Sequence, residues 1–255
     1  MRSNMMLLMA AAIWGLGFVA QRLGMDHMGP FTFNGLRFLL GAASLLPLLW
    51  WLKSRQPRPQ AGSPAGDRRL LLVGGLIAGG VLFSAASLQQ VGLLYTTAAK
   101  AGFITGLYII LVPVIGLALR HKTGANTWIG ALIAMAGLYY LSVTEEFTIG
   151  YGDLLQVIGA LFWAIHLLVL DHYSNRVAPI RLAGVQFVVC GLLSLGTAFV
   201  IETPTLGGAV AGWQALLYAG LVSVGIGYTL QVVGQRGAHP AHAAIILSLE
   251  TVFAA

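Results

Sequence analysis

Long apolar stretches with few or no charged side chains dominate this sequence. About 20 helical residues cross the roughly 30 Å hydrocarbon core of a bilayer, and several of these stretches reach that length. Of the 255 residues, 58% are hydrophobic and 9% are charged, whereas soluble domains carry about 25% charged residues. With so few charges the chain cannot form a water-soluble surface of this size, so we predict that its surface faces lipid.

The apolar stretches predict helices, because strands of a membrane barrel would alternate apolar and polar residues. We therefore expect an all-α, polytopic membrane helical bundle. Its nine helices are predicted at residues 5–23, 32–52, 69–89, 95–119, 125–143, 153–173, 180–200, 212–235 and 240–255. The stretch from Lys53 to Arg69 is rich in Pro, Gly, Arg and Gln and predicts a solvated loop. The single cysteine, Cys190, excludes an intrachain disulfide and a multi-cysteine metal site.

The charged residues predict the orientation of the bundle, because Lys and Arg are retained on the cytoplasmic side during insertion. With a cytoplasmic amino terminus, the predicted outer loops contain only Arg22 and Lys100, and Arg37 lies within a helix. The predicted inner loops then hold eleven of the 14 basic residues: Arg2, Lys53, Arg55, Arg58, Arg68, Arg69, Arg120, Lys122, Arg176, Arg181 and Arg236. We expect a multi-pass protein of the cell (inner) membrane with its amino terminus in the cytoplasm.

The sequence repeats itself across its whole length. Trp14 matches Trp163, and the pairs Pro30/Pro179 and Phe38/Phe187 show the same offset of 149 residues. Residues 88–92 match residues 230–234 with an offset of 142. We expect a first five-helix repeat at residues 1–144 and a second at 145–255. Since five is odd, the second repeat enters from the opposite side, which is the inverted construction common in secondary transporters.

The fourth helix of each repeat is predicted from residues 98–114 and 241–254. We align Lys100 with His242, and residues 111–114 with 249–252. This alignment makes the first copy four residues longer and sets Val112 opposite Glu250. The second repeat lacks its last helix, so nine helices stand where the complete fold would have ten. We interpret this chain as a fragment or a truncated product.

In its order of motifs the chain resembles the EamA-type transporters of the drug/metabolite transporter superfamily. The resembling pieces include IWGLGFVAQRLG, LRFLLGAASLLPL, KAGFITGLYIILVPV, WIGALIAMAGLYYLS, GDLLQVIGALFWAIHLLVLD and AHAAIILSLETVFAA. The resemblance implies ten helices and the transport, often the export, of small metabolites such as amino acids.

Two positions depart from the family pattern. The family often has Pro after the late Glu, where this chain has Thr251, so we expect that helix to be straighter. The family often has Gly-Glu at the end of the fourth helix, where this chain has Arg120-His121-Lys122.

Ionisable side chains inside apolar helices are the first candidates for a binding site, because a charge at mid-membrane is costly unless it faces a cavity or a partner. Arg37 either extends to the outer interface or attracts a substrate carboxylate. Glu250 either binds a substrate ammonium or a proton, or pairs with Arg37 or another donor. Lys100 and its counterpart His242 are either interface anchors or binding residues.

Aromatic and uncharged polar side chains complete the candidate site. Trp14 and Trp163 either approach a common centre from the two repeats or are packing or interface anchors. At a common centre, their aromatic faces would suit apolar, aromatic or cationic substrates. His166 shares a helix face with Trp163 and is either a hydrogen-bonded core residue or part of the site. Buried polar groups in lipid need partners, either each other or a substrate. The uncharged polar set is Gln89, Gln90, Gln186, Gln231, Tyr95, Tyr108 and Tyr228. Of these we expect Gln90, Tyr108, Tyr228 and Gln231 in the binding site.

These patterns together predict a secondary active transporter, most simply an exporter of small organic metabolites such as amino acids, working by alternating access. The alternative is a membrane-embedded enzyme or a non-transporting bundle. We expect no catalytic residues, no metal, no cofactor and no nucleic acid partner. The expected partners are a small-molecule substrate and the lipid bilayer. Small residues spaced four apart, as at Gly75 and Gly79, support close helix packing and leave a homodimer open.

Overall fold

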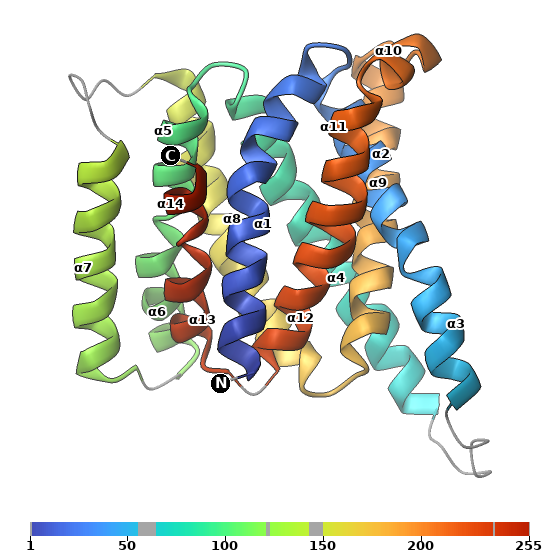
Figure 1. Ribbon diagram of the computed structural model, residues 1–255. Coiled ribbons are helices and arrows are strands. Elements are labelled where there is room, and N and C mark those ends of the chain that lie inside the picture. The colour runs from blue at the N-terminus through green and yellow to red at the C-terminus, as the bar shows by residue number, and fades with distance from the viewer. Residues whose placement is uncertain (1, 56–64, 121–122, 143–149, 237, 255) are drawn as a thin grey trace.

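A computed structural model describes residues 2–55, 65–120, 123–142, 150–236 and 238–254, and every regular element in these residues is a helix (Figure 1). The first segments form α1 (Arg2–Met25), α2 (Pro30–Ser44), α3 (Leu46–Arg55), α4 (Ala65–Gly92), α5 (Ala98–Thr105), α6 (Tyr108–Ala118) and α7 (Ala125–Ser142). The later segments form α8 (Tyr151–Ser174), α9 (Pro179–Ile201), α10 (Leu206–Ala211), α11 (Trp213–Leu217), η1 (Tyr218–Tyr228), α12 (Thr229–Gln235), α13 (Pro240–Leu247) and α14 (Glu250–Ala254).

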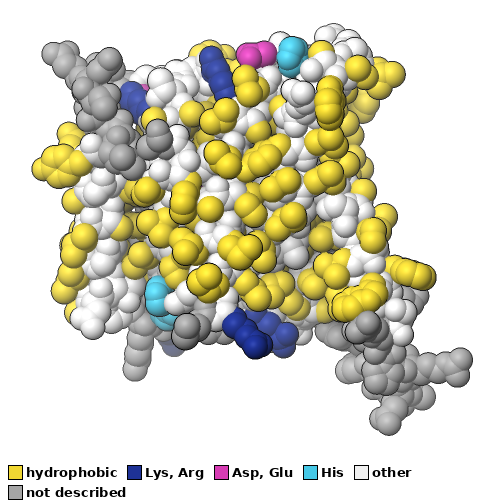
Figure 2. All heavy atoms as spheres, viewed as in Figure 1, with side chains coloured by type: hydrophobic (Ala, Val, Ile, Leu, Met, Phe, Trp, Pro, Cys, Tyr) yellow, Lys and Arg dark blue, Asp and Glu magenta, His cyan; other side chains and the backbone are white. Residues whose placement is uncertain are grey.

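The structure confirms a polytopic helical membrane bundle. Within the described residues, seven helices are long and apolar enough to cross a membrane, and the residues 240–254 form a shorter apolar helix. In the view of Figure 2, hydrophobic side chains cover the middle of the molecule and charged side chains lie at its two edges. This distribution fits a protein whose central band contacts hydrocarbon, where a charge is costly.

The loop predicted from Lys53 to Arg69 is shorter than expected, since α3 continues to Arg55 and α4 already begins at Ala65. Ala, Arg and Lys are good helix formers, so the helices extend past their apolar stretches. Residues 56–64, with Arg58, lie outside the described residues, as do Lys122, Glu145 and Glu146. The boundary at 144/145 also falls outside them, and the division into two repeats and the orientation in the membrane stay predictions.

The two ends of the bundle differ in which helices begin there. We call the end at which α1 begins the amino-terminal face, and the end at which α5 and α8 begin the α5 face (Figure 1). The helices α1 and α8 each have 24 residues and run in opposite directions. Pro30, Pro179 and Pro240 each occupy the first position of a helix, where the missing proline N–H loses no helical hydrogen bond.

Packing interleaves the first part of the chain with the second. Helix α4 packs against α8 and α9, α2 against α9 and η1, and α1 against η1, α12 and α14. The largest buried cluster accordingly draws on both parts, with Phe38 and Leu82 beside Trp163 and Phe187. A cavity near the centre of this bundle is therefore bounded by both parts of the chain.

The helix at residues 98–118 and the shorter apolar helix at residues 240–254 are interrupted at equivalent positions. Helix α5 ends at Thr105 and α6 begins at Tyr108, while α13 ends at Leu247 and α14 begins at Glu250. Each bound of the second pair lies 142 residues after its counterpart, so the four-residue insertion of our alignment is wrong, and Tyr108 rather than Val112 corresponds to Glu250.

The late helix is interrupted, although it has Thr251 in place of a proline. Its interruption lies at Ser248 and Leu249, and Pro113 lies inside α6 without ending it. At both interruptions the backbone tightens, with Leu107 N–H donating to Ile104 at 3.1 Å and Leu249 N–H to Ile246 at 3.3 Å. We expected a straighter helix because it lacks the proline. Both interruptions instead contain a backbone hydrogen bond to the residue three positions earlier.

Arg120 follows α6 with a φ of 63°, a left-handed conformation that favours glycine. Glycine is what the family pattern often has near this position. Arg120 therefore occupies a backbone conformation that its side chain does not favour.

We predict that Gly15→Ala destabilises the bundle by about 1–3 kcal/mol through overpacking. A Cβ at Gly15 would lie 2.7 Å from the Phe253 carbonyl carbon and 2.8 Å from the Glu250 carbonyl oxygen, so backbone has to move. The matched control is Gly137→Ala in α7, where a Cβ meets nothing within 4 Å. Thermal unfolding in detergent compares the two variants, and equal melting temperatures would contradict the close contact of α1 with α14.

Candidate functional site

A cavity lies inside the bundle at the level where α1 and α8 reach their midpoints, marked by Trp14 and Trp163. Its volume is about 30 Å³, which has room for about two water molecules. Its lining comes from both parts of the chain and comprises Trp14, Phe18, Gln21, Arg37, Gln89, Thr105, Tyr108, Trp163, Leu167, Ser223, Tyr228, Gln231, Leu247 and Glu250.

Three aromatic rings form one wall of the cavity. The rings of Trp14 and Tyr228 lie 4.5 Å apart, and those of Trp163 and Tyr228 are stacked at 6.2 Å. Both indole N–H groups are occupied, because Trp14 donates to the carbonyl oxygen of Ser223 at 3.2 Å and Trp163 to Gln89 Oε1 at 2.9 Å. The ring faces are therefore left as the contact surface, which suits apolar or cationic groups.

Arg37 brings a buried positive charge to the cavity. Only 2% of its surface is exposed, and its guanidinium lies 4.9 Å from the centre of the Phe38 ring. Its Nε donates to Asn34 Oδ1 at 2.9 Å, and Asn34 in turn donates to the carbonyl oxygen of Ala86 on α4 at 3.1 Å. No carboxylate of the described residues lies within ion-pair distance of Arg37. The rest of its fork remains available to a planar anionic group such as a carboxylate.

Glu250 brings a buried carboxyl group to the same cavity. The Tyr108 hydroxyl donates to Glu250 Oε1 at 3.1 Å, and both side chains are buried. Glu250 does not pair with Arg37, but the structural alternative from the sequence, a pair with Arg37 or another donor, is met by the Tyr108 hydroxyl. Each partner is the first residue after an interruption, one at the start of α6 and the other at the start of α14. Interrupted helices of this kind are typical of binding sites in transporters.

Gln89 connects the cavity to a polar network that sequence reasoning missed as part of the site. Its Oε1 accepts from Trp163, and its Nε2 donates to Gln21 Oε1 at 3.3 Å. Its backbone carbonyl accepts from Gln156 Nε2 at 2.9 Å. Gln89 and Gln90 are adjacent in the sequence, and adjacent residues on a helix point in different directions. The sequence alone does not show which of the two side chains points toward the cavity.

The helix opposite α1 departs from α-helical geometry beside the cavity. Residues 218–228 form a π-helical stretch, η1, which contains Ser223 and Tyr228. Such stretches are uncommon and are frequently found at functional sites. The sequence contains no signal for it beyond the glycines of this stretch.

Seven of the ten predicted site residues line the cavity: Trp14, Arg37, Tyr108, Trp163, Tyr228, Gln231 and Glu250. Further lining residues that were not predicted are Phe18, Gln21, Gln89, Thr105, Leu167, Ser223 and Leu247.

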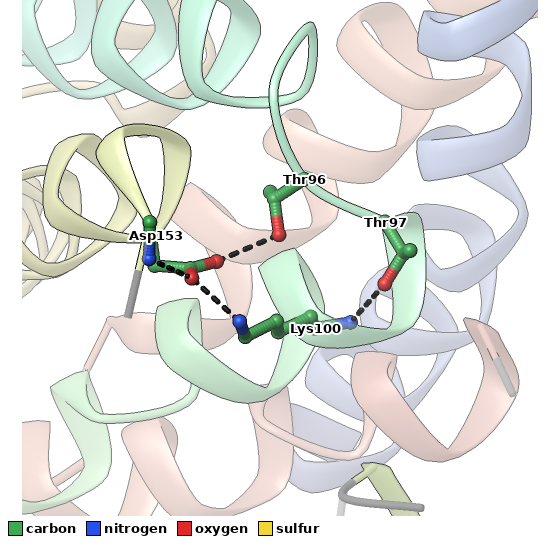
Figure 3. A network of polar contacts seen from close by, with 5 residues as sticks. Thr96, Thr97, Lys100 and Asp153 are labelled. Atoms are coloured by element: carbon green, nitrogen blue, oxygen red, sulfur yellow. Dashed lines mark hydrogen bonds and ion pairs between the residues drawn. The ribbon is translucent and has the colours of Figure 1, made fainter. Parts of the chain in front are cut away.

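The other three predicted residues lie outside the cavity lining. Gln90 is buried, and its Nε2 donates to the carbonyl oxygen of Gln21 at 3.4 Å. His166 lies against Trp163, as its spacing predicts, but its Nε2 bonds Gln186 Oε1 at 2.9 Å. Lys100 forms an ion pair with Asp153 at 2.6 Å on the α5 face (Figure 3). All three have protein partners. This is the structural alternative given for Gln90 and His166, whereas the ion pair of Lys100 was not among its expected roles.

In the described part of the chain no group of three or more His, Cys, Asp or Glu side chains is arranged to hold a metal ion. The chemistry available in the cavity is therefore that of one guanidinium, one carboxyl group, aromatic faces and amides.

Comparisons with known proteins agree on the kind of protein. The EamA-like transporter family matches residues 1–143 and 150–255. An uncharacterized transporter of Archaeoglobus fulgidus is 32% identical over 97% of this chain and 74% of its own length. The uncharacterized transporter YetK of Bacillus subtilis is 29% identical over 83% of this chain and 65% of its own length. A protein crystal structure with 19% identity has a TM-score of 0.76 over 99% of this chain and 85% of its own, which shows a shared fold.

We predict that Gln89→Leu destabilises the protein by about 1–3 kcal/mol, because the indole N–H of Trp163 and the amide of Gln21 lose a buried partner. The control is Gln214→Leu, an exposed glutamine on α11. Thermal unfolding measures stability, and tryptophan fluorescence reports whether Trp163 has changed its surroundings. A Gln89→Leu protein as stable as the control would contradict the network.

Proposed function

The chain belongs to the EamA-like transporter family, and we propose that it carries small zwitterionic metabolites, amino acids in particular, across the membrane by alternating access. The observation that carries this proposal is the presence of Arg37 and Glu250 in one central cavity. An amino acid has one carboxylate and one ammonium, and the cavity offers one group of opposite charge to each.

Each part of an amino acid has a matching group in the cavity wall. The guanidinium of Arg37 suits the substrate carboxylate, because its fork matches carboxylate geometry. Glu250 suits the ammonium, and Gln231 adds a buried Oε1 that accepts no hydrogen bond from the described residues. The rings of Trp14, Trp163 and Tyr228 suit an apolar or aromatic side chain.

The size and place of the cavity support alternating access. A volume of about 30 Å³ is far below the several hundred Å³ typical of ligand pockets, so the helices must separate before a substrate fits. The cavity is bounded by residues from both predicted repeats. In inverted-repeat transporters the two repeats move against each other around a site near mid-membrane, and we propose the same motion here.

We further propose export across the cell (inner) membrane, with the amino terminus in the cytoplasm. The excess of basic residues in the predicted inner loops supports this orientation, and the family resemblance supports export. A transporter is also favoured over an enzyme by the family and by the depth of the site. A membrane enzyme is expected to hold its reacting groups near one interface, whereas Trp14 and Trp163 lie at the midpoints of their helices.

The proposal is tested with purified protein in proteoliposomes. Thermal shifts against single amino acids and against matched amines and carboxylic acids select ligands, and the uptake of radiolabelled ligand then measures transport. We expect stabilisation by amino acids and much less by compounds that lack either charge. Stabilisation by single-charge compounds alone would overturn the zwitterion proposal.

Two substitutions of Arg37 distinguish the effect of its positive charge on binding from the effect of its forked shape. We predict that Arg37→Gln weakens amino-acid binding by tenfold or more, while Arg37→Lys retains part of the affinity, since an ammonium offers charge without the bidentate fork. Arg236→Gln, an exposed arginine at the end of α12, serves as the control. Thermal shift titration measures the apparent Kd. Unchanged affinity in Arg37→Gln would exclude Arg37 as the carboxylate-binding residue.

Glu250 is the only carboxylate among the described residues that line the cavity, so we propose it as the carrier if transport is coupled to protons. We then expect Glu250→Gln to abolish stimulation of transport by a pH gradient while ligand exchange across the membrane persists. Tyr108→Phe retains the carboxyl group and should retain the stimulation. Transport by Glu250→Gln that still follows the pH gradient would contradict this role.

A further inference from the structure

A charged contact on the α5 face joins the two parts of the chain. Lys100 Nζ lies 2.6 Å from Asp153 Oδ2, and the Thr96 hydroxyl donates to Asp153 Oδ1 at 2.7 Å (Figure 3). The Gly150 N–H donates to Asp153 Oδ2 at 2.8 Å. Lys100 belongs to α5 and Asp153 to α8, so this group of residues connects the start of one helix with the start of the other.

The environment of Asp153 makes this contact difficult to break. Its side chain is 4% exposed, and that of Lys100 is 25% exposed. Removing one partner of a buried ion pair leaves an uncompensated charge, which is strongly unfavourable. The start of α8 also touches the end of α4 at this face, since a Cβ at Gly152 would lie 2.7 Å from the carbonyl oxygen of Gly92. Separation of α5 from α8 at this face therefore requires the ion pair to open.

A second contact on the same face also crosses between the two parts. The carboxylate of Glu202, after the end of α9, accepts from the N–H groups of Phe31 and Thr32, both at 2.8 Å. It also accepts from the Thr32 hydroxyl at 2.6 Å. A carboxylate at the first turn of α2 is favoured by the helix dipole, so the α5 face is fastened at two separate places.

The amino-terminal face has different residues at the positions that correspond to the ion pair. Asp153 corresponds to Asn4 with the offset of 149, and Lys100 corresponds to His242 with the offset of 142. Both Asn4 and His242 are exposed. The ion pairs found among the described residues include none between α1 and α13 on this face.

We infer that Lys100, Asp153 and Thr96 form a latch that holds the cavity closed toward the α5 face, so that the substrate-free protein opens preferentially toward its amino-terminal face. This inference rests on the proposed alternating access. It adds a direction to the proposed alternating access: with the predicted orientation, the face without the Lys100–Asp153 pair is cytoplasmic, where an exporter receives its substrate. The ion pair makes Lys100 a gating residue rather than a binding residue.

The test measures access to the cavity from each face without any substrate. A reporter cysteine replaces Ser223, which lines the cavity, in a Cys190→Ala background that removes the native thiol. A membrane-impermeant maleimide is added to proteoliposomes in which the protein has one known orientation, and then to those with the reverse orientation. The labelling rate from each side gives the accessibility of the cavity.

With the latch intact, we expect faster labelling from the amino-terminal face. Lys100→Gln and Asp153→Asn should each raise labelling from the α5 face at least tenfold, and the double variant should show less than the product of the two increases, because both remove one interaction. Lys100→Arg should stay close to the starting protein.

The matched control is Arg176→Gln, since Arg176 contacts His172 in its own chain segment and does not join the two parts. It should leave labelling from the α5 face unchanged. The inference is overturned if Lys100→Gln and Asp153→Asn leave that rate unchanged, or if labelling rises equally from both faces, which indicates a loosened bundle. Loss of transport with the expected labelling pattern would instead contradict the proposed function alone.

Discussion

A polar side chain inside a bilayer must find its partner within the protein, because hydrocarbon offers none. This constraint explains where the polar groups of the chain lie. Gln89 joins Gln21 and Trp163, and Tyr108 joins Glu250. The contacts of Gln89 with Trp163 and of Tyr108 with Glu250 join the first part of the chain to the second, and that of Gln89 with Gln21 lies within the first part. The side chains that hydrogen-bond one another therefore also line the central cavity. The structural requirement and the candidate binding site thus share the same side chains.

The sequence was sufficient for the fold because apolar length is a strong signal. A stretch of about 20 apolar residues has few alternatives to a membrane helix, and Pro30 and Pro179 both stand at the first position of a helix, as their matched spacing in the sequence predicts. The central site was also predictable in part. Arg37 and Glu250 are evident from the sequence because a charge within an apolar membrane helix is costly unless it faces a cavity or a partner. Trp14 and Trp163 are evident because they occupy matching positions in the two predicted repeats.

What the sequence could not provide was rotation about the helix axis and the local path of the backbone. Gln89 and Gln90 are adjacent, yet only Gln89 reaches the cavity, because neighbouring residues on a helix point about 100° apart. Lys100 was also a candidate binding residue, and only the approach of α8 reveals its partner Asp153. The interruption at Ser248 and Leu249 contains no proline, so composition does not indicate it.

The corrected correspondence between Tyr108 and Glu250 gives the site its asymmetry. Two carboxylates at these facing positions would repel each other, and two tyrosines would leave the cavity without a negative charge for an ammonium. A tyrosine opposite a glutamate supplies one charge and one neutral hydrogen-bond donor, 3.1 Å apart. In the proposed transport of amino acids, the substrate ammonium replaces the tyrosine hydroxyl as the partner of the carboxylate, since a charged donor forms the stronger hydrogen bond. Binding and release then exchange one satisfied state of Glu250 for another, which keeps the buried carboxylate partnered throughout a transport cycle.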